Sequence, residues 1–333
     1  MRFQIYAPGP AGHGVVRHAR SVTSLCEAHG AIGTDDEPDL THVHFTDALF
    51  GDTIEKAVDA YRDWAASARR PLVVTVHDVP DPFGHTWRDR NRCRGYAAVL
   101  EASDAVIVSA EHEARKVTAL TRKPVHHIDL PLPPEPVSAP NDTPLQPASS
   151  LVLLGYLYPG KGHLEAIDLA AAVGQGNADG PPAVIAAGAV SAGHGDLLDR
   201  VREHAVRRQV PFLLTGHLSD TEFTDLARSA RVPVVLNRNV SASGSLLSWL
   251  SCRRRPVTWA GRYSREIDRR YPGNLLLGES ERELTRHIIR ALAHPGVTRS
   301  PTRPAWSDTG AEHLAVYRRV LANVDRRPVV TPC

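Results

Sequence analysis

The sequence predicts an α/β protein made of two doubly wound domains that face a central cleft. Two observations lead to this prediction. Short apolar segments alternate with amphipathic ones along the chain, and the series stops at a proline-rich stretch and then starts again. Continuous apolar runs are typical of strands buried on both faces of a parallel sheet, and their alternation with helices is the pattern of an α/β fold. A length of 333 residues fits two such domains.

Composition excludes several classes of protein. The 39 basic and 37 acidic side chains give a net charge of +2, so no overall field would attract nucleic acid. The four cysteines are far apart and form no Cys-x-x-Cys pair, which argues against a zinc site or a disulfide framework and favours a reducing cytoplasm. No apolar run approaches the roughly 18 residues that span a bilayer. We expect a cytoplasmic protein without a transmembrane segment, and peripheral contact with a membrane stays open.

The first domain is expected over residues 1–130. A strand at 3–7 leads into the loop Pro-Gly-Pro-Ala-Gly-His-Gly, and a helix follows from about 15 to 29, before a glycine that suits a helix end. Another helix is expected at about 53–68, and one more between the last two strands. The remaining strands are expected at 41–45, 71–79, 105–109 and 125–130.

A proline-rich linker over 131–150 separates this domain from the second one, expected over 151–305, because proline removes backbone donors and blocks regular structure. Strands are expected at 151–154, 183–188, 211–216, 233–237, 256–260 and 274–278. Helices are expected at about 163–173, 195–208 and 220–229. The remainder, 306–333, contains an amphipathic helix at 307–324 with Ser307 as a good N-cap.

The stretch from Leu236 to Thr258 predicts an anion site. It reads Arg-x-x-x-x-Ser-Gly-Ser and then becomes apolar, so a loop of small residues leads into the N-terminus of a short helix. Free N–H groups and the positive end of the helix dipole favour a phosphate there, and a glycine allows close approach. Three arginines at 253–255 follow. The alternative is a serine-capped core helix with a solvated arginine run.

Two further loops follow predicted strands. Gly-Tyr-Leu-Tyr-Pro-Gly-Lys-Gly-His places Lys161 at the start of a helix, where it can pair with a phosphate, although a surface lysine is the alternative. The spacing is not that of a Walker A motif. The glycines at 9, 12 and 14 do not form the dinucleotide fingerprint, and the acidic residue expected about 20 positions later is absent. A hydride-transfer enzyme is therefore disfavoured.

His77 ends a buried strand, where a histidine meets ligands of a parallel sheet and can hydrogen-bond a substrate hydroxyl; the alternative is a histidine satisfied by backbone groups. His42 and His44 alternate along one strand, and we expect them to point to opposite faces. With no third convergent ligand in the sequence, we expect no metal site there, and the same holds for His126 and His127.

Together these segments resemble, over nearly the whole chain, the retaining glycosyltransferases of family 4, which have the GT-B fold of two Rossmann-like domains that bind a nucleotide sugar. Three segments resemble family segments of the first domain: the glycine loop, the segment Thr-His-Val-His-Phe-Thr-Asp and the strand end Val-His-Asp. The second domain contributes Leu-Leu-Gly-Tyr-Leu-Tyr-Pro-Gly-Lys-Gly, Leu-Leu-Thr-Gly-His and Ser-Gly-Ser-Leu-Leu. The last helix resembles the one that crosses back to the N-terminal domain.

The resemblance also implies roles for individual residues. His77 is implied as the catalytic residue that reaches the donor sugar. Donor binding is implied for Gly12, Gly14, Lys161, Gly216, His217, Arg238, Ser243, Gly244, Ser245 and Leu246. Acceptor binding is implied for His13, His44, Thr46 and Asp47.

The implied reaction moves a sugar from a nucleotide-sugar donor, a UDP-sugar by default, to a hydroxyl of a small-molecule or glycan acceptor with retention. It needs no metal and no cofactor other than this co-substrate. The family usually has two glutamates eight positions apart; this chain has Ser248 at the second and Val240 and Ser241 near the first. A non-catalytic nucleotide-sugar or glycan-binding protein is therefore the alternative. A nucleotide-sugar epimerase is a third hypothesis.

Overall fold

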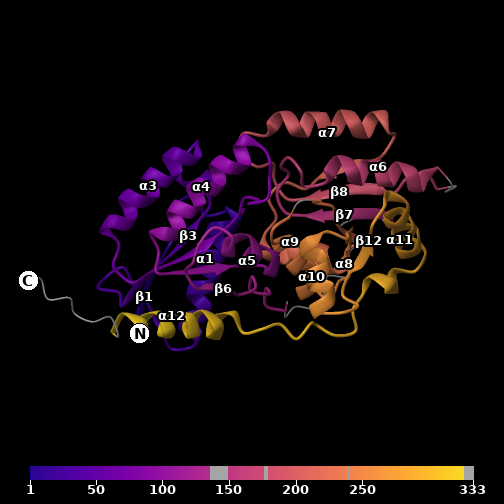
Figure 1. The fold of residues 1–333 in the computed structure, drawn as a ribbon. Helices are drawn as coiled ribbons and strands as arrows, with labels where there is room; N and C mark the ends of the chain where they lie inside the picture. The colour runs from indigo at the N-terminus through magenta and orange to yellow at the C-terminus, as the bar shows by residue number, and fades with distance from the viewer. Residues whose placement is uncertain (136–148, 176–178, 239, 326–333) are drawn as a thin grey trace, which may run out of the picture. The chain divides into compact units, whose positions relative to one another are not determined.

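The computed structural model describes residues 1–135, 149–175, 179–238 and 240–325. The chain divides into two compact units, the first from Met1–Pro131 with Ser307–Cys333 and the second from Leu132–Trp306. Each unit is an α/β layer structure with its own parallel sheet (Figure 1). The doubly wound α/β class predicted from the sequence is therefore confirmed. Most of the predicted linker, 136–148, lies outside the described residues.

The sheet of the first unit has the strand order β2-β1-β3-β4-β5-β6, and all of its pairings are parallel. The central strands β3, β4 and β5 are buried along their whole length, which explains the nearly unbroken apolar sequences of β4 and β5. The strands are β1 (Arg2–Tyr6), β2 (Ile32–Gly33), β3 (Leu40–Phe45), β4 (Leu72–Val76), β5 (Ala105–Val108) and β6 (Val125–His127).

Helices cover both faces of this sheet. One core joins the sheet to α3 and α4, with Tyr61 and Tyr96 fully buried. A second core lies on the opposite face of the sheet, where α1 packs against α12 and Phe3 contacts Tyr317. The helices of this unit are α1 (Gly14–Ala28), α2 (Asp47–Phe50), α3 (Ile54–Ser67), α4 (Trp87–Glu101), α5 (Glu111–Thr118) and α12 (Thr309–Asp325).

The sheet of the second unit has the order β12-β11-β10-β7-β8-β9, again all parallel. Its core joins the strands to α6, α7 and α11. The strands are β7 (Ser150–Leu154), β8 (Ala183–Ala187), β9 (Phe212–Leu214), β10 (Val232–Val235), β11 (Val257–Trp259) and β12 (Leu276–Gly278). The helices are α6 (His163–Gly174), α7 (Gly195–Arg207), α8 (Asp220–Ser229), α9 (Gly244–Ser251), α10 (Arg262–Arg270), α11 (Glu281–Ala293) and the 3-10 helix η1 (Pro295–Thr298).

Both strand orders contain a point where the chain reverses its direction across the sheet. In the first unit this point lies between β1 and β3, and in the second it lies between β7 and β10. The loops that leave two such neighbouring strands diverge to opposite sides, which opens a crevice at the carboxyl edge of the sheet. Each unit therefore offers one site for a ligand, fixed by its topology.

The element boundaries differ from the sequence predictions at several strand ends. The strand expected at 71–79 ends at Val76, because Asp78 adopts a left-handed conformation with φ 50° and turns the chain. The strand expected at 125–130 likewise ends at His127. Helices α4, α10 and α11 were not predicted. Within the described part of the chain, no helix combines the length and apolar character that a membrane span requires.

Gly162 is closely packed at the second unit's crevice, and it yields a test of the fold. Its φ is 99°, and a Cβ there would lie 2.5 Å from the Cβ of Leu236. We expect Gly162→Ala to lower the free energy of unfolding by about 1–3 kcal/mol, because it adds backbone strain to a steric overlap. Urea denaturation measures this loss.

Gly195→Ala is the matched control, because Gly195 begins α7 and a Cβ there meets nothing within 4 Å. We expect its stability to stay equal or rise slightly. Equal stability of the two variants would contradict the close packing of α6 against Leu236.

Candidate functional site

Lys161 lies at the crevice of the second unit, in the loop between β7 and α6. Its side chain is buried, with 6% of its surface exposed. The ammonium donates a hydrogen bond to the hydroxyl of Ser245, at 2.8 Å, and lies 5.6 Å from the centre of the Tyr158 ring. Ser245 follows β10, so the contact joins the two loops that flank the reversal point.

Among the described residues no carboxylate pairs with Lys161, so no counter-charge offsets the loss of hydration of its charged form. Burial lowers the pKa of Lys161 to about 8, because the charged form loses its hydration. His163 lies beside it, 3% exposed, with no hydrogen-bond partner for either ring nitrogen, and burial together with Lys161 lowers its pKa to about 3. A buried cation without a counter-charge is a site prepared for an anion.

The N-terminus of α9 supplies further donors at this place. Ser243 caps the helix by accepting a hydrogen bond from the Leu246 N–H at 3.2 Å, and its hydroxyl lies 3.3 Å from that of Ser245. Leu246 itself is fully buried. Gly244 is exposed, and a Cβ there would meet no atom within 4 Å. An anion can therefore approach the first turn of α9, where the helix dipole is positive.

The other residues expected at the donor site have different surroundings. Arg238 stacks on Trp259 at 3.6 Å and lies 3.6 Å from a carboxylate oxygen of Glu281, with about half of its side chain exposed. Gly216 has φ 75°, and His217 is exposed just before α8. The structure brings together Lys161, Ser243, Gly244, Ser245 and Leu246, whereas Arg238 has its partners at Trp259 and Glu281.

The arginines at 253–255 do not form a phosphate site. Arg254 is buried and donates to the backbone carbonyls of Arg228, Ala230 and Thr298, and burial lowers its pKa to about 10. Arg253 pairs with Glu135 at 2.8 Å. The expectation that this run is either an anion site or a solvated surface was wrong for Arg254, which ties α8 to η1.

His77 lies directly after β4 in the first unit, and its backbone is held on two sides. Its N–H donates to the carbonyl of Phe45 at 2.8 Å, and its carbonyl accepts from the hydroxyl of Tyr96 at 2.7 Å. Burial lowers the pKa of His77 to about 4; Asp78 opposes this shift and His13 adds to it. At neutral pH the ring is therefore uncharged and can donate one hydrogen bond.

His77 belongs to a buried cluster of histidines. Its Nε2 lies 3.2 Å from Nδ1 of His44, and the ring centre of His44 lies 4.7 Å from that of His42. The expectation that His42 and His44 point to opposite faces was wrong, because residues two apart in a strand share a face. His18 on α1 is a third convergent histidine, so the argument against a metal-ligand group failed on both of its premises.

The residues expected to bind an acceptor have partners inside the first unit. His13 caps α1 by accepting from the Val15 N–H at 3.2 Å. Thr46 is buried and donates to Asp78 at 3.1 Å. Asp47 accepts from both Arg92 Nε, at 2.8 Å, and Arg92 Nη2, at 3.1 Å. Gly12 is exposed, and Gly14 begins α1 with open space around it.

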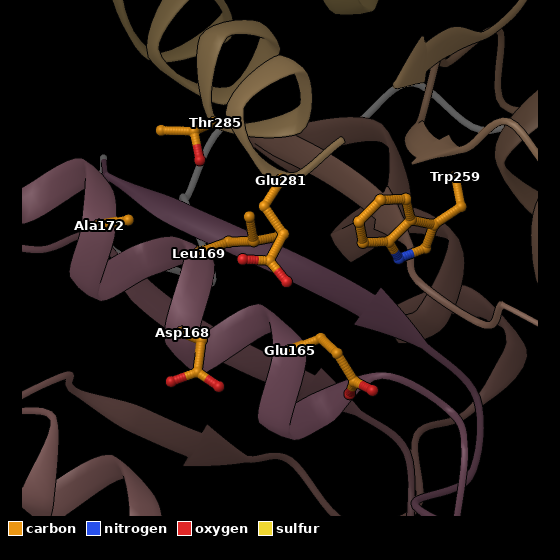
Figure 2. Close-up of a pocket in the computed structure, with 7 residues that line it drawn as sticks. All are labelled: Glu165, Asp168, Leu169, Ala172, Trp259, Glu281 and Thr285. Carbon is orange, nitrogen blue, oxygen red and sulfur yellow. The ribbon is translucent and has the colours of Figure 1, made fainter. Parts of the chain in front are cut away.

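A small acidic pocket lies elsewhere in the second unit, between α6 and α11. Figure 2 shows Glu165 and Asp168 on successive turns of α6, with Glu281 and Trp259 opposite. Its volume of about 70 Å³ is far below the roughly 300 Å³ that a small-molecule site needs. Its three carboxylates would also repel a diphosphate. The nucleotide of a sugar donor does not fit this pocket.

Sequence reasoning missed three residues of these sites. His18 follows Val15 and precedes Val22 on the buried face of α1, so helical spacing alone could have placed it toward the sheet. Helical spacing could likewise have placed His163 on the buried face of α6. The stacking of Trp259 on Arg238 had no sequence signal, because the two residues are on different elements.

Comparisons with known proteins show the fold. No family of sequences matches this chain, and no curated protein does. Solved structures match at full length. Anabaena Alr3699/HepE in complex with UDP and glucose has a TM-score of 0.64 at 14% identity, over 98% of this chain and 97% of that one. Sucrose-phosphate synthase of Thermosynechococcus elongatus has a TM-score of 0.67 at 13% identity, over 98% and 97%.

WaaG, a glycosyltransferase involved in lipopolysaccharide biosynthesis, matches with a TM-score of 0.60 at 12% identity, over 98% of this chain and 96% of that one. These neighbours are GT-B glycosyltransferases. The GT-B fold predicted from the sequence is therefore confirmed.

The buried charge of Lys161 gives a test that needs no ligand. Its pKa is lowered from 10.5 to about 8, so protonation at pH 7 destabilises the folded protein. We expect Lys161→Met to raise the free energy of unfolding by about 2–3 kcal/mol at pH 7. The difference in stability between Lys161→Met and the wild type stays constant below about pH 8. It shrinks as the pH rises toward 10.5, because above that pH the lysine is deprotonated in the unfolded as well as in the folded protein.

Denaturation at several pH values measures this difference. The control is Lys56→Met, because the side chain of Lys56 is 69% exposed and its removal should change stability little. A Lys161→Met protein less stable than the wild type at pH 7 would show that the lysine is satisfied in the folded chain.

Proposed function

We propose that this protein is a retaining glycosyltransferase that moves a sugar from a nucleotide-sugar donor to a hydroxyl acceptor. The observation that carries the proposal is the buried, unpaired Lys161 at the reversal point of the second unit, bonded to Ser245 at the N-terminus of α9. A departing nucleoside diphosphate is the anion that such a site would hold.

The chemistry of sugar transfer explains the need for this arrangement. Cleavage of the bond to the anomeric carbon leaves negative charge on the diphosphate, and fixed donors that face this charge stabilise the transition state. Lys161 supplies a full charge, and the N-termini of α6 and α9 supply N–H groups. In the proposed mechanism these groups replace a divalent cation, so the reaction proceeds without metal.

The donor proposed is a UDP-sugar. Alr3699/HepE, which has the same fold, has been solved with UDP, with UDP and glucose, and with UDP-glucose. That protein is only 14% identical to this chain, so the likeness supports a nucleotide-sugar donor without identifying the sugar.

His77 is the proposed catalytic residue. Its ring is neutral at pH 7 and its backbone is fixed by Phe45 and Tyr96, so it can present one N–H to a sugar hydroxyl with little loss of conformational freedom. Retention then follows if the acceptor attacks on the face from which the diphosphate leaves. This route requires no protein nucleophile.

A nucleotide-sugar-binding protein without catalysis is the second candidate, and one observation favours it. Ser248 stands where the family resemblance implies a glutamate, and its hydroxyl donates to the carbonyl of Gly244 at 3.0 Å within α9. It therefore offers no carboxylate to a donor.

Incubation with a panel of nucleotide sugars, with and without hydroxyl acceptors, tests the proposal. Release of the nucleoside diphosphate that depends on an acceptor, with a retained anomeric product, supports a retaining transferase. Binding without turnover across the panel supports the second candidate, and conversion of the donor to its epimer supports a nucleotide-sugar epimerase.

Lys161→Met should change affinity and stability in opposite directions. We expect its affinity for UDP to fall by about 1.5–3 kcal/mol, the size of a hydrogen bond to a charged group, while the folded protein becomes more stable. Arg238→Ala should cost less, below about 1 kcal/mol, because this side chain is half exposed and already pairs with Glu281. Calorimetric titration measures both; unchanged affinity in Lys161→Met would refute the phosphate assignment.

Gly244→Val tests close approach of the ligand to α9. Because a Cβ at Gly244 meets nothing within 4 Å, we expect nearly normal stability. The valine side chain would occupy the space next to the first turn, so the affinity for UDP should fall by roughly tenfold or more. Intact affinity with a large fall in melting temperature would instead indicate that this glycine serves only packing.

His77→Ala tests the division between sugar and phosphate contacts. We expect kcat to fall by about 100-fold with the Kd for UDP nearly unchanged, because the ring is proposed to meet the sugar. The rate of the wild type should survive EDTA. His85→Ala, at an exposed histidine, is the control. An equal loss of UDP affinity in His77→Ala, or activity lost to EDTA and restored by manganese, would contradict this mechanism.

A further inference from the structure

We propose that His18, His44 and His77 form a binding site for a transition metal ion, with Zn²⁺ as the best fit. Each of the three side chains offers one ring nitrogen, and these nitrogens lie within 4.8 Å of one another. The residues come from α1, from β3 and from the turn after β4, so the first unit's crevice assembles the group from three separate elements.

The nearest pair already has the spacing of metal ligands. Nδ1 of His44 and Nε2 of His77 are 3.2 Å apart. Zinc binds imidazole nitrogens at about 2.0–2.1 Å in tetrahedral geometry, which places two ligand nitrogens roughly 3.4 Å apart. The ring centre of His18 lies 4.9 Å from that of His44 and 5.5 Å from that of His77, so the third ring faces the same place as the pair.

Unsatisfied nitrogens point to a missing ligand. His18 is only 8% exposed, yet neither of its ring nitrogens has a hydrogen-bond partner among the described residues. Burying such a group without a partner costs free energy, and coordination of an ion would recover part of it. Imidazole ligands without a carboxylate suit zinc, copper and nickel, and not magnesium or calcium.

Of the described residues, three histidines meet in this group, and the neighbouring His42 has partners elsewhere. His42 uses both ring nitrogens, toward Tyr317 at 2.6 Å and Thr75 at 2.7 Å. His313 directs Nδ1 to the carbonyl of Thr309 at 2.7 Å. His77 is only partly buried, so an ion can enter from its side and keep a fourth position for water.

Metal binding requires a tautomer shift. In the ion-free protein, either His44 or His77 carries the proton that lies between their nitrogens at 3.2 Å. Coordination uses both lone pairs, so this proton moves to the other nitrogen of its own ring. No net proton is released, because all three rings remain neutral imidazoles.

One consequence rests on the proposed function. An ion on His77 fixes the orientation of the ring and places positive charge beside it, whereas sugar transfer is proposed to use a neutral ring that turns its N–H toward the sugar. Zn²⁺ would therefore inhibit transfer, and EDTA would relieve the inhibition. The binding site itself does not depend on this proposal, since it can be measured without any donor.

The test is titration of EDTA-treated, full-length protein with Co²⁺ and then with Zn²⁺. We expect one equivalent of Co²⁺ to give visible absorption bands of a tetrahedral or five-coordinate site, and Zn²⁺ to abolish them by displacement. His18→Gln and His77→Gln should each weaken binding by at least roughly tenfold. His85→Gln should bind as the wild type does.

His77→Gln decides the matter if His18→Gln does not fold, because His77 is only partly buried and lies after the strand. Circular dichroism confirms that each variant is folded. Absence of bands in the wild type, or equal binding by wild type and folded His77→Gln, would overturn the site. If binding is confirmed and Zn²⁺ leaves sugar transfer unaffected, the role of His77 in transfer fails while the metal site stands.

Discussion

The second unit depends on one unfavourable interaction, the burial of the Lys161 ammonium without a carboxylate partner. Burial alone shifts its pKa from 10.5 to about 8, so the folded chain carries a cost that an anion would remove. The surrounding sequence follows from that requirement. Gly162 turns the chain against Leu236, Ser245 accepts a hydrogen bond from the ammonium, and Gly244 leaves the first turn of α9 open.

The same topological rule acts in the first unit with different chemistry. Its reversal point between β1 and β3 gathers histidines, and burial lowers the pKa of His18, His44 and His77, so these rings are uncharged at neutral pH. The turn after β4 is held by Tyr96 and by Arg92, which binds Asp47 and the carbonyl of Asp78. These contacts fix the backbone at His77 and leave its ring to the ligand.

Sequence patterns predicted the architecture well and the sites in part. Strands such as Val73 to Val76 are buried on both faces, so their composition alone identifies them. Lys161 and Ser245 could be assigned separately because each follows a predicted strand. That they meet depends on β7 and β10 being neighbours, which is a property of the strand order. The histidine cluster was missed because a wrong face was assigned to His42 and His44, and because His18 enters from a helix. The ion pair of Arg238 with Glu281 lay beyond any local pattern.

The two proposals for His77 are linked, because an ion bound to the ring fixes the orientation and the charge of the same ring that is proposed to contact the sugar. If the ion weakens the binding of the donor by some factor, thermodynamic linkage requires that the donor weakens the binding of the ion by the same factor. Only the sugar end of the donor would show this coupling, since the proposed phosphate contacts belong to Lys161 and α9. Free UDP and the ion should then bind independently, while the intact nucleotide sugar and the ion should compete. In these proposals the second unit supplies the anion site, which many ligands could fill, and the histidines of the first unit supply selection for the sugar that distinguishes a donor from its product.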